Sequence, residues 1–402
     1  MEEVRLGTLT NRKIGYGIVQ PGPSVPNGIP VIKVNNVVSG LRDIRDLDTT
    51  TAEIDCKYSR TKLVGGEIVV SVVGTVGKTA IVPDSFAGCN LVRATAMVDI
   101  LNPLIKYWVR YYIDSPQGQQ YIKANLNTTV QFALNIKSLV DMPIPMYSSG
   151  YMKKAVSFLK SLDDKIECNR RINENLEQQA QALFKSWFVD FEPFKDGEFV
   201  ESELGMIPKG WRAESLTSVA NYLNGLAMQK FRPEANDKGL PVLKIKELGQ
   251  GTCDQSSDRC SSNIEEQYII SDGDVIFSWS GTLLVDIWCG GRCGLNQHLF
   301  KVSSSGYPKW FYYMWTKEHL KNFIHIAKDK AVTMGHIKRR HLEEAKVLVP
   351  TQSVLDNMTN TMHPVIDDII ETRVESRRLA ELRDTLLPKL MSGELDVNNV
   401  AL

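Results

Sequence analysis

The chain has 402 residues, of which 43% are hydrophobic and 23% charged, so it can form two domains with buried cores and is not disordered as a whole. Lys plus Arg equals Asp plus Glu at 47 each, so the net charge gives no sign of a polyanionic partner. No stretch approaches the roughly 20 apolar residues that span a bilayer, and the chain starts acidic, which predicts a cytoplasmic protein without a membrane partner.

Two compositional details qualify this picture. The seven cysteines are an odd number at low density, which predicts free thiols in a reducing compartment. Residues 321–346 carry seven Lys or Arg against three acidic residues. A basic DNA-binding face and a solvated helix face remain equal interpretations of that segment.

An internal repeat with a period of about 205 residues runs through the chain. The segment 30–34 (PVIKV) returns as 241–245 (PVLKI), and both predict short buried strands. The segment 66–69 (GEIV) returns as 273–276 (GDVI). The sequence therefore predicts two copies of one α/β unit.

A Gly-Thr pair follows the second strand in each copy, at Gly74 and at Gly281. A turn that ends a strand there would use the freedom of glycine at positive φ. Aromatic segments that begin near Lys106 and Lys309 then predict helices with large buried faces, and Asn102 is expected to cap the first of them.

Each copy is followed by a long helical pattern in which apolar residues alternate in steps of three and four. The two patterns lie 203 residues apart, and at roughly 1.5 Å per residue each helix would span about 50 Å. The first seam comprises Leu159, Leu162, Ile166, Asn169, Asn173, Leu176 and Leu183, and the second comprises Met362, Val365, Ile369, Thr372, Ser376, Leu379 and Leu386.

Polar residues interrupt both seams at the same two layers, Asn169 and Asn173 in one and Thr372 and Ser376 in the other. A buried polar layer disfavours shifted registers, because a slipped pairing would leave an amide or hydroxyl unsatisfied. We therefore expect an antiparallel coiled coil with Asn173 opposite Ser376. The alternative is two surface helices, each packed on its own domain.

Signatures of enzymatic chemistry are weak. No Pro-Pro pair occurs, so the Asn-Pro-Pro-aromatic box typical of an adenine methyltransferase is missing. The segment 74–79 (GTVGKT) ends like a phosphate-binding loop, but Val72 stands where that motif needs its first glycine. Cys253, Cys260, Cys289 and Cys293 lack the spacing of a zinc knuckle. We expect no catalytic residue, no bound metal and no cofactor on this chain.

Two repeated domains held at a fixed distance by helices suit recognition of a bipartite DNA site, because the separation of the two half-sites must match the separation of the two domains. The candidate contacts are polar residues on repeat-related loops, because such side chains read base edges and phosphates. In the first copy they are Lys33, Asn35, Asn36, Ser71, Thr75, Lys78, Thr128, Thr129 and Gln131, and in the second Lys244, Lys246, Ser278, Ser280, Thr282, Thr333, His336, Lys338 and Arg339.

The central junction, residues 186–194 (SWFVDFEPF) and 202–211 (SELGMIPKGW), resembles that of type I restriction-modification specificity subunits. The terminus 387–395 (LPKLMSGEL) is similar to that of the same family. The resemblance implies an α+β fold with two pseudo-symmetric α/β target recognition domains separated by two long helices that form an antiparallel coiled coil. The expected segments are recognition domains at 1–150 and 211–351, a first spacer helix at 151–190, a linker at 191–210, and a second spacer helix with the C-terminal tail at 352–395.

The resemblance also implies partners and their chemistry. Double-stranded DNA and two modification (methyltransferase) subunits would bind this non-catalytic chain, and a restriction (translocase-nuclease) subunit could join them. S-adenosylmethionine, ATP and Mg would be bound by those partner subunits. The competing hypothesis is a two-domain protein-interaction scaffold that does not bind DNA, and the neutral net charge is its main support.

Overall fold

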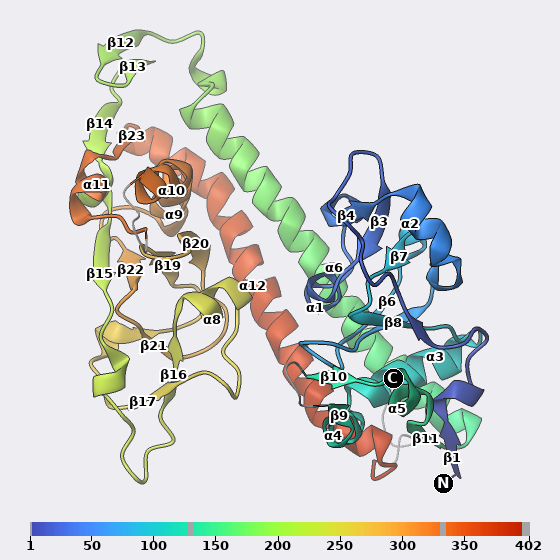
Figure 1. The fold of residues 1–402 in the computed structure, drawn as a ribbon. Coiled ribbons are helices and arrows are strands. Elements are labelled where there is room, and N and C mark those ends of the chain that lie inside the picture. The colour runs from blue at the N-terminus through green and yellow to red at the C-terminus, as the bar shows by residue number, and fades with distance from the viewer. Residues whose placement is uncertain (1, 128–131, 330–334, 396–402) are drawn as a thin grey trace. The chain divides into compact units, whose positions relative to one another are not determined.

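The computed structural model describes residues 2–127, 132–329 and 335–395. The chain divides into two compact units, Met1–Asp163 with Ala380–Leu402 (the first unit) and Asp164–Leu379 (the second unit). Each unit contains an antiparallel main sheet, a second sheet with one parallel pair, short helices and part of both long helices (Figure 1). The expected α+β class with two α/β domains and two long helices is confirmed.

The first unit is built on an antiparallel sheet of order β2-β8-β5-β6 and a second sheet of order β4-β3-β7, in which β3 and β7 are parallel. A separate pair, β1-β11, joins the start of the domain to its end. The strands are β1 (Glu2–Arg5), β2 (Gly15–Tyr16), β3 (Ile29–Ile32), β4 (Asp48–Thr50), β5 (Ile68–Ser71), β6 (Thr79–Ile81), β7 (Asn90–Leu91), β8 (Thr95–Val98), β9 (Leu126–Asn127), β10 (Ala133–Leu134) and β11 (Pro143–Met146). The short helices are α1 (Val34–Ser39), α2 (Ala52–Lys57), α3 (Pro103–Asp114), α4 (Pro116–Ala124) and α5 (Ile136–Val140).

The second unit repeats this connectivity. Its sheets have the orders β15-β22-β19-β20 and β17-β16-β21-β18, and the pair β14-β23 corresponds to β1-β11. The strands are β12 (Phe199–Ser202), β13 (Gly205–Pro208), β14 (Arg212–Ser215), β15 (Asn221–Asn224), β16 (Leu240–Leu243), β17 (Arg259–Cys260), β18 (Ile269–Ile270), β19 (Val275–Ser278), β20 (Leu284–Ile287), β21 (Cys293–Leu295), β22 (Leu299–Ser303) and β23 (Lys346–Val349). The helices are α7 (Leu216–Val219), α8 (Ile245–Gln250), α9 (Lys309–Glu318), α10 (Leu320–Asp329) and α11 (Arg339–Glu344).

The two long helices are α6 (Ser149–Phe188) and α12 (Gln352–Met391). Each has 40 residues, and α12 begins 203 residues after α6, so the repeat extends to their full length. All the expected seam residues are buried or half-buried in the unit to which they belong.

The helix caps follow from the sequence. Asn102 lies before α3 and its Oδ1 accepts from the backbone N–H groups of Leu104 and Ile105, at 2.9 and 3.3 Å, as expected. The first copy of the repeated strand ends two residues earlier than expected, because Lys33 has left the sheet and precedes helix α1. Lys244 precedes α8 in the same way.

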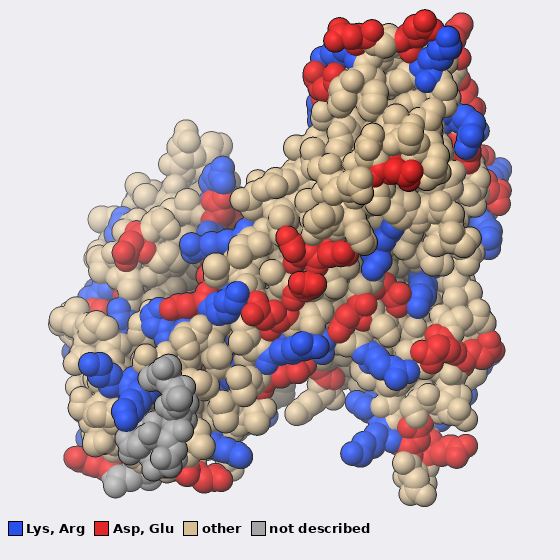
Figure 2. Space-filling model, turned by 180° about the vertical axis from the view of Figure 1, so that it is seen from behind, with Lys and Arg blue, Asp and Glu red and all other residues tan. Residues whose placement is uncertain are grey.

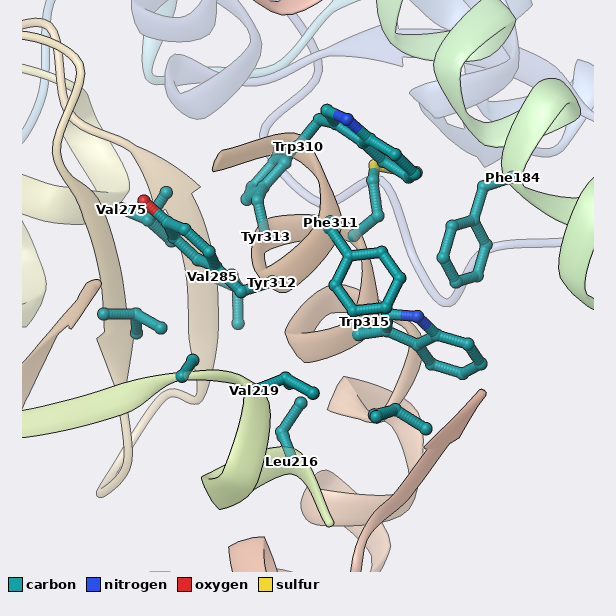
Figure 3. Close-up of a cluster of buried hydrophobic side chains, with 14 of the residues drawn as sticks. Phe184, Leu216, Val219, Val275, Val285, Trp310, Phe311, Tyr312, Tyr313 and Trp315 are labelled. Carbon is teal, nitrogen blue, oxygen red and sulfur yellow. The ribbon is translucent and has the colours of Figure 1, made fainter. Parts of the chain in front are cut away.

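An aromatic core joins the long helices to the domain of the second unit. Figure 3 shows Phe311 and Trp315 of α9 facing Phe184 of α6, with Val275 and Val285 of the sheet on the other side of α9. The ring centroids of Phe184 and Trp315 lie 5.0 Å apart in an edge-to-face arrangement, the geometry that aromatic pairs prefer. The long helices are thus part of the domain core as well as of a helix pair.

Candidate nucleic-acid interface

A tight turn leaves the central strand of the main sheet in each unit. After β5 the chain turns at Gly74, with φ of 79°, and after β19 it turns at Gly281, with φ of 65°. Both values lie in the left-handed region that favours glycine, as the sequence predicted. Each turn leads into another strand and not into a helix, so the segment 74–79 is not a phosphate-binding loop.

A second segment is attached to each turn by backbone hydrogen bonds. The Gly74 N–H donates to the Phe132 carbonyl oxygen at 2.9 Å, and the Gly281 N–H donates to the Gly335 carbonyl oxygen at 3.0 Å. Isolated bridges join Val73 to Ala133 in one unit and Ser280 to His336 in the other. The turn and the segment that follows it at residues 132–134 or 335–337 therefore form one edge in each unit.

The exposed candidates for DNA contact gather near these edges or on the helices that follow β3 and β16. In the first unit they are Lys33, Asn35, Thr75 and Lys78, with Asn36 half-buried. In the second they are Lys246, Thr282, His336, Lys338 and Arg339, with Lys244 half-buried. Thr128, Thr129, Gln131 and Thr333 lie outside the described residues.

Three of the candidate serines are not available as surface groups. Ser71 and Ser278 are fully buried, and Ser280 is 5% exposed. The Ser71 Oγ accepts from the Lys78 N–H at 2.9 Å, and the Ser278 Oγ donates to the Thr282 carbonyl oxygen at 2.8 Å. Ser71 and Ser278 therefore hold the turn in shape through these hydrogen bonds. Because all three serines are buried, we do not propose them as DNA contacts.

Lys33 and Lys244 form equivalent ion pairs. The Lys33 Nζ lies 2.5 Å from Asp48, and the Lys244 Nζ pairs with Asp258. Asp48 belongs to β4, the strand that pairs with β3, and Asp258 directly precedes β17, the strand that pairs with β16. These lysines are already neutralised locally, so a contact to phosphate would have to compete with a carboxylate.

Charges of both signs are mixed on the surface. Figure 2 shows Lys and Arg side chains interspersed with Asp and Glu over the face that it presents. The described part of the basic segment 321–346 is also paired in places, since Arg340 lies 3.1 Å from Glu344 and Lys346 lies 2.9 Å from Glu203. On the face shown, no region carries Lys and Arg without Asp or Glu nearby, so any attraction for a polyanion there is local.

The candidate zinc ligands do not form a shared site. The described residues contain no group of three or more His, Cys, Asp or Glu side chains placed to hold a metal ion. Cys253 and Cys293 are hydrogen-bonded to each other, and burial together with this contact raises the pKa of the Cys293 thiol far above its usual range.

A polar layer lies in the helix pair of the second unit. The Asn169 Nδ2 donates to Glu375 Oε2 at 2.6 Å, and the Thr372 Oγ1 donates to Asn173 Oδ1 at 2.9 Å. The expected pairing of Asn173 with Ser376 is wrong by one helical turn, because Ser376 Oγ instead donates to the Thr372 carbonyl oxygen at 2.8 Å. The hydrogen bond from Asn169, followed by that from Lys165, lowers the pKa of Glu375.

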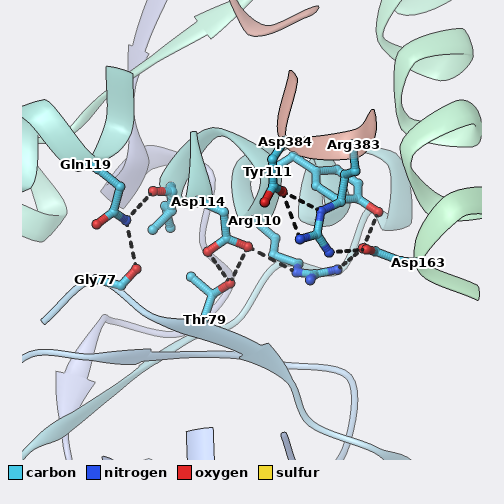
Figure 4. A network of polar contacts seen from close by, with 10 residues as sticks. Gly77, Thr79, Arg110, Tyr111, Asp114, Gln119, Asp163, Arg383 and Asp384 are labelled. Carbon is cyan, nitrogen blue, oxygen red and sulfur yellow. Dashed lines mark hydrogen bonds and ion pairs between the residues drawn. The ribbon is translucent and has the colours of Figure 1, made fainter. Parts of the chain in front are cut away.

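A half-buried ionic network ties both long helices to the domain of the first unit. Figure 4 shows Arg110 of α3 and Arg383 of α12 converging on Asp163 of α6, at 2.8 and 2.9 Å. Burial opposes ionisation of Asp163, but the Arg110 charge and the hydrogen bond from Arg383 outweigh it and lower its pKa. Asp114 nearby accepts from Thr79 Oγ1 at 2.7 Å, and burial raises its pKa to about 6. Strand β6, which follows the Gly74 turn, is thus connected to α6 and α12 through the side chains of this network.

These features define a class of protein, one with two repeated α/β units, a loop edge in each, and two long helices shared between the units. No protein-family model matches the chain. It is 29% identical over 308 residues to the type I restriction enzyme MjaIX specificity subunit of Methanocaldococcus jannaschii, covering 74% of this chain and 71% of that protein. It is 23% identical over 332 residues to the HindI specificity subunit of Haemophilus influenzae, covering 67% and 72%.

The fold is similar to the crystal structure of a type I restriction-modification S subunit from M. genitalium, with a TM-score of 0.55, 14% sequence identity, and coverage of 97% of this chain and 95% of that one. The chain is thus similar in sequence to type I restriction enzyme specificity subunits and similar in fold to a type I restriction-modification S subunit. In the part that the structure describes, no helix has the length and apolar character needed to cross a membrane.

Proposed function

We propose that this chain is the DNA-specificity subunit of a type I restriction-modification complex. The first and second units each read one half of a bipartite DNA site through the edge that contains the Gly-Thr turn. Helices α6 and α12 dock the methyltransferase subunits. The chain itself performs no chemistry.

The observation that carries this proposal is the repetition of one backbone edge with different side chains. Both edges use a turn at a glycine with positive φ, equivalent backbone bonds and an equivalent attached segment. A scaffold for one constant ligand would gain nothing from changing the exposed residues on a repeated frame. A reader of two different half-sites requires that change.

Mixed surface charge is compatible with this role when binding is shared among subunits. Salt-dependent affinity for DNA comes mainly from Lys and Arg at phosphates, so partner subunits would supply much of it. We expect those partners to be two methyltransferase subunits that bind S-adenosylmethionine, with a restriction subunit that uses ATP and Mg as a further component. No cofactor is assigned to this chain.

The test is co-expression of the chain with the methyltransferase subunit encoded beside it, followed by single-molecule sequencing of host DNA for N6-methyladenine. We expect methylation at one split motif that disappears when this chain is deleted. Exchange of residues 211–351 for those of a homologue should change one half of the motif and leave the other half intact. Methylation that persists without the chain would support the scaffold hypothesis instead.

Point variants give a sharper version of this test. Replacing Thr75 and Lys78 by Ala removes exposed polar groups from the first edge, and replacing Thr282 and Lys338 removes them from the second. Each pair should weaken methylation of the split site without changing the fold, because none of the four side chains is buried. Lys106→Ala is the matched control, since Lys106 lies beside Gly66 at the opposite end of β5.

A further inference from the structure

A second tight turn lies at the same end of the main sheet in each unit, directly before β8 and before β22. The first is closed by a bond from the Thr95 N–H to the Val92 carbonyl oxygen, and the second by a bond from the Leu299 N–H to the Asn296 carbonyl oxygen, both at 3.0 Å. Arg93 occupies the second position of one turn, and Gln297 occupies the second position of the other.

The surrounding backbone bonds make these two positions equivalent residue by residue. The N–H groups of Val92 and Asn296 both donate to the last residue of the neighbouring strand, β3 or β16, at 3.2 Å. Each turn is also bonded to the Gly-Thr turn, since the Val72 N–H donates to the Ala94 carbonyl oxygen at 2.8 Å and the Trp279 N–H donates to the His298 carbonyl oxygen at 3.4 Å. Arg93 and Gln297 therefore belong to the two candidate edges.

A glycine on the neighbouring strand end keeps this backbone approach close in both units. A Cβ on Gly17 would lie 1.9 Å from the Leu91 carbonyl oxygen, and a Cβ on Gly225 would lie 2.2 Å from the Asn296 carbonyl oxygen. Neither distance is possible without a backbone shift. The position of each turn is thus set by the main chain, independently of which side chain it carries.

The side chains on the two turns have different chemistry. Arg93 is exposed, and within the described residues its guanidinium makes no hydrogen bond or ion pair. Gln297 is half-buried, and its Nε2 lies 3.2 Å from His298 Nε2. His298 Nδ1 lies 3.1 Å from Ser280 Oγ, so one tautomer explains both contacts: Nδ1 carries the proton and donates to Ser280, while Nε2 accepts from the Gln297 amide.

We propose that Arg93 and Gln297 are specificity-determining residues at the same position of the two readers, and that they select different bases. An arginine fork matches the O6 and N7 acceptors of guanine, whereas a glutamine amide matches the N6 donor and N7 acceptor of adenine. Arg93 thus requires guanine in one half-site, and Gln297 requires adenine in the other. His298 is a positioning residue that fixes the orientation of the Gln297 amide. This proposal rests on the proposed function.

The experiment is selection from a random double-stranded DNA library by the complex of this chain with its co-expressed methyltransferase subunits, at one fixed salt concentration. The wild-type complex should select a split motif. Arg93→Lys keeps the charge but lacks the planar fork, so it should retain overall binding and lose about 10- to 100-fold of the preference for guanine at one position of one half-site. Lys106→Ala removes a positive charge far from the turn and should leave every base preference unchanged.

Two further variants address the second turn. Gln297→Ala should relax adenine preference in the other half-site only, and His298→Ala should relax the same position to a smaller extent, with an unchanged unfolding midpoint. If the wild-type complex selects no motif, the proposed function fails. If it selects a split motif but the Arg93 and Gln297 variants leave base preference intact, or affect both half-sites equally, the assignment of these two residues is overturned and the proposed function stands.

Discussion

Asp163 is the position where a single substitution should most strongly loosen the helices from the first unit. Its carboxylate forms ion pairs with Arg110 Nη1 at 2.8 Å and with Arg383 Nη1 at 2.9 Å, and it accepts a hydrogen bond from the Tyr111 hydroxyl at 2.8 Å. The Asp163 side chain is only 16% exposed. Asp163→Ala would leave two guanidinium groups close together without their shared counter-charge.

The expected cost follows from the burial of the three partners. Removing one partner of a buried ion pair costs about 3–5 kcal/mol. The Arg110 and Arg383 side chains are 22% and 27% exposed, so water can partly solvate them and we expect about 3 kcal/mol, the lower end of that range. For a unit of this size that loss corresponds to a melting temperature lower by about 6–12 °C.

Hydrogen exchange measured by mass spectrometry can locate the effect, because the whole chain has two units that need not unfold together. Amides of α3 should exchange roughly 100-fold faster in Asp163→Ala than in the wild type. Asp163→Asn retains one acceptor and should lie between the two proteins. Glu53→Ala, which breaks only an exposed pair with Lys57, is the control and should change nothing. Unchanged exchange in α3 would refute the proposed importance of this network.

Three other predictions concern the core, the pH response and the helix pair. Trp310→Ala removes a fully buried indole that donates to Thr359 Oγ1, so urea denaturation should show the second unit destabilised by about 3–5 kcal/mol, and an unchanged midpoint would contradict this. The pKa of Asp114 is raised, so its ionisation opposes folding. Asp114→Asn should therefore stabilise the first unit against thermal unfolding above pH 6, and this gain should fade as the pH falls toward 4. A gain in stability that does not depend on pH would exclude this cause. Asn173→Ala and Thr372→Val should be coupled by about 0.5–1.5 kcal/mol in a double-mutant cycle, whereas strict additivity would mean that their hydrogen bond contributes nothing.

The structure combines the two interpretations of the long helices, because they both pair with each other and pack on the domains. Met362 and Ile369 of α12 are buried in the same apolar cluster as Trp310 and Phe311 of the domain. Asn169 of α6 meanwhile bonds Glu375 of α12 directly. Each helix therefore has one face for its partner helix and another that packs on the domain of the first unit at one end and of the second unit at the other, which explains why its apolar pattern is wider than a two-helix seam alone needs.

Features that depend on local chemistry or on spacing along the chain could be predicted from the sequence. The repeat, the Gly-Thr turns with positive φ, the Asn102 cap and the burial of the seam all have their causes within a few residues or in a fixed periodicity. These features can be predicted without knowledge of the fold, because backbone conformation at glycine, capping geometry and helical period are properties of short segments.

Features that depend on partners distant in the chain were decided only by the tertiary structure. The seam could not distinguish Thr372 from Ser376 as the partner of Asn173, because both lie on the same helix face one turn apart. Ser71 is polar yet fully buried, since the packed fold covers both faces of β5 and all four residues of that strand are buried. Arg93 and Gln297 became comparable only through backbone bonds to strands far away in the sequence, and the physical reason is that a three-dimensional edge is assembled from segments that no periodicity connects.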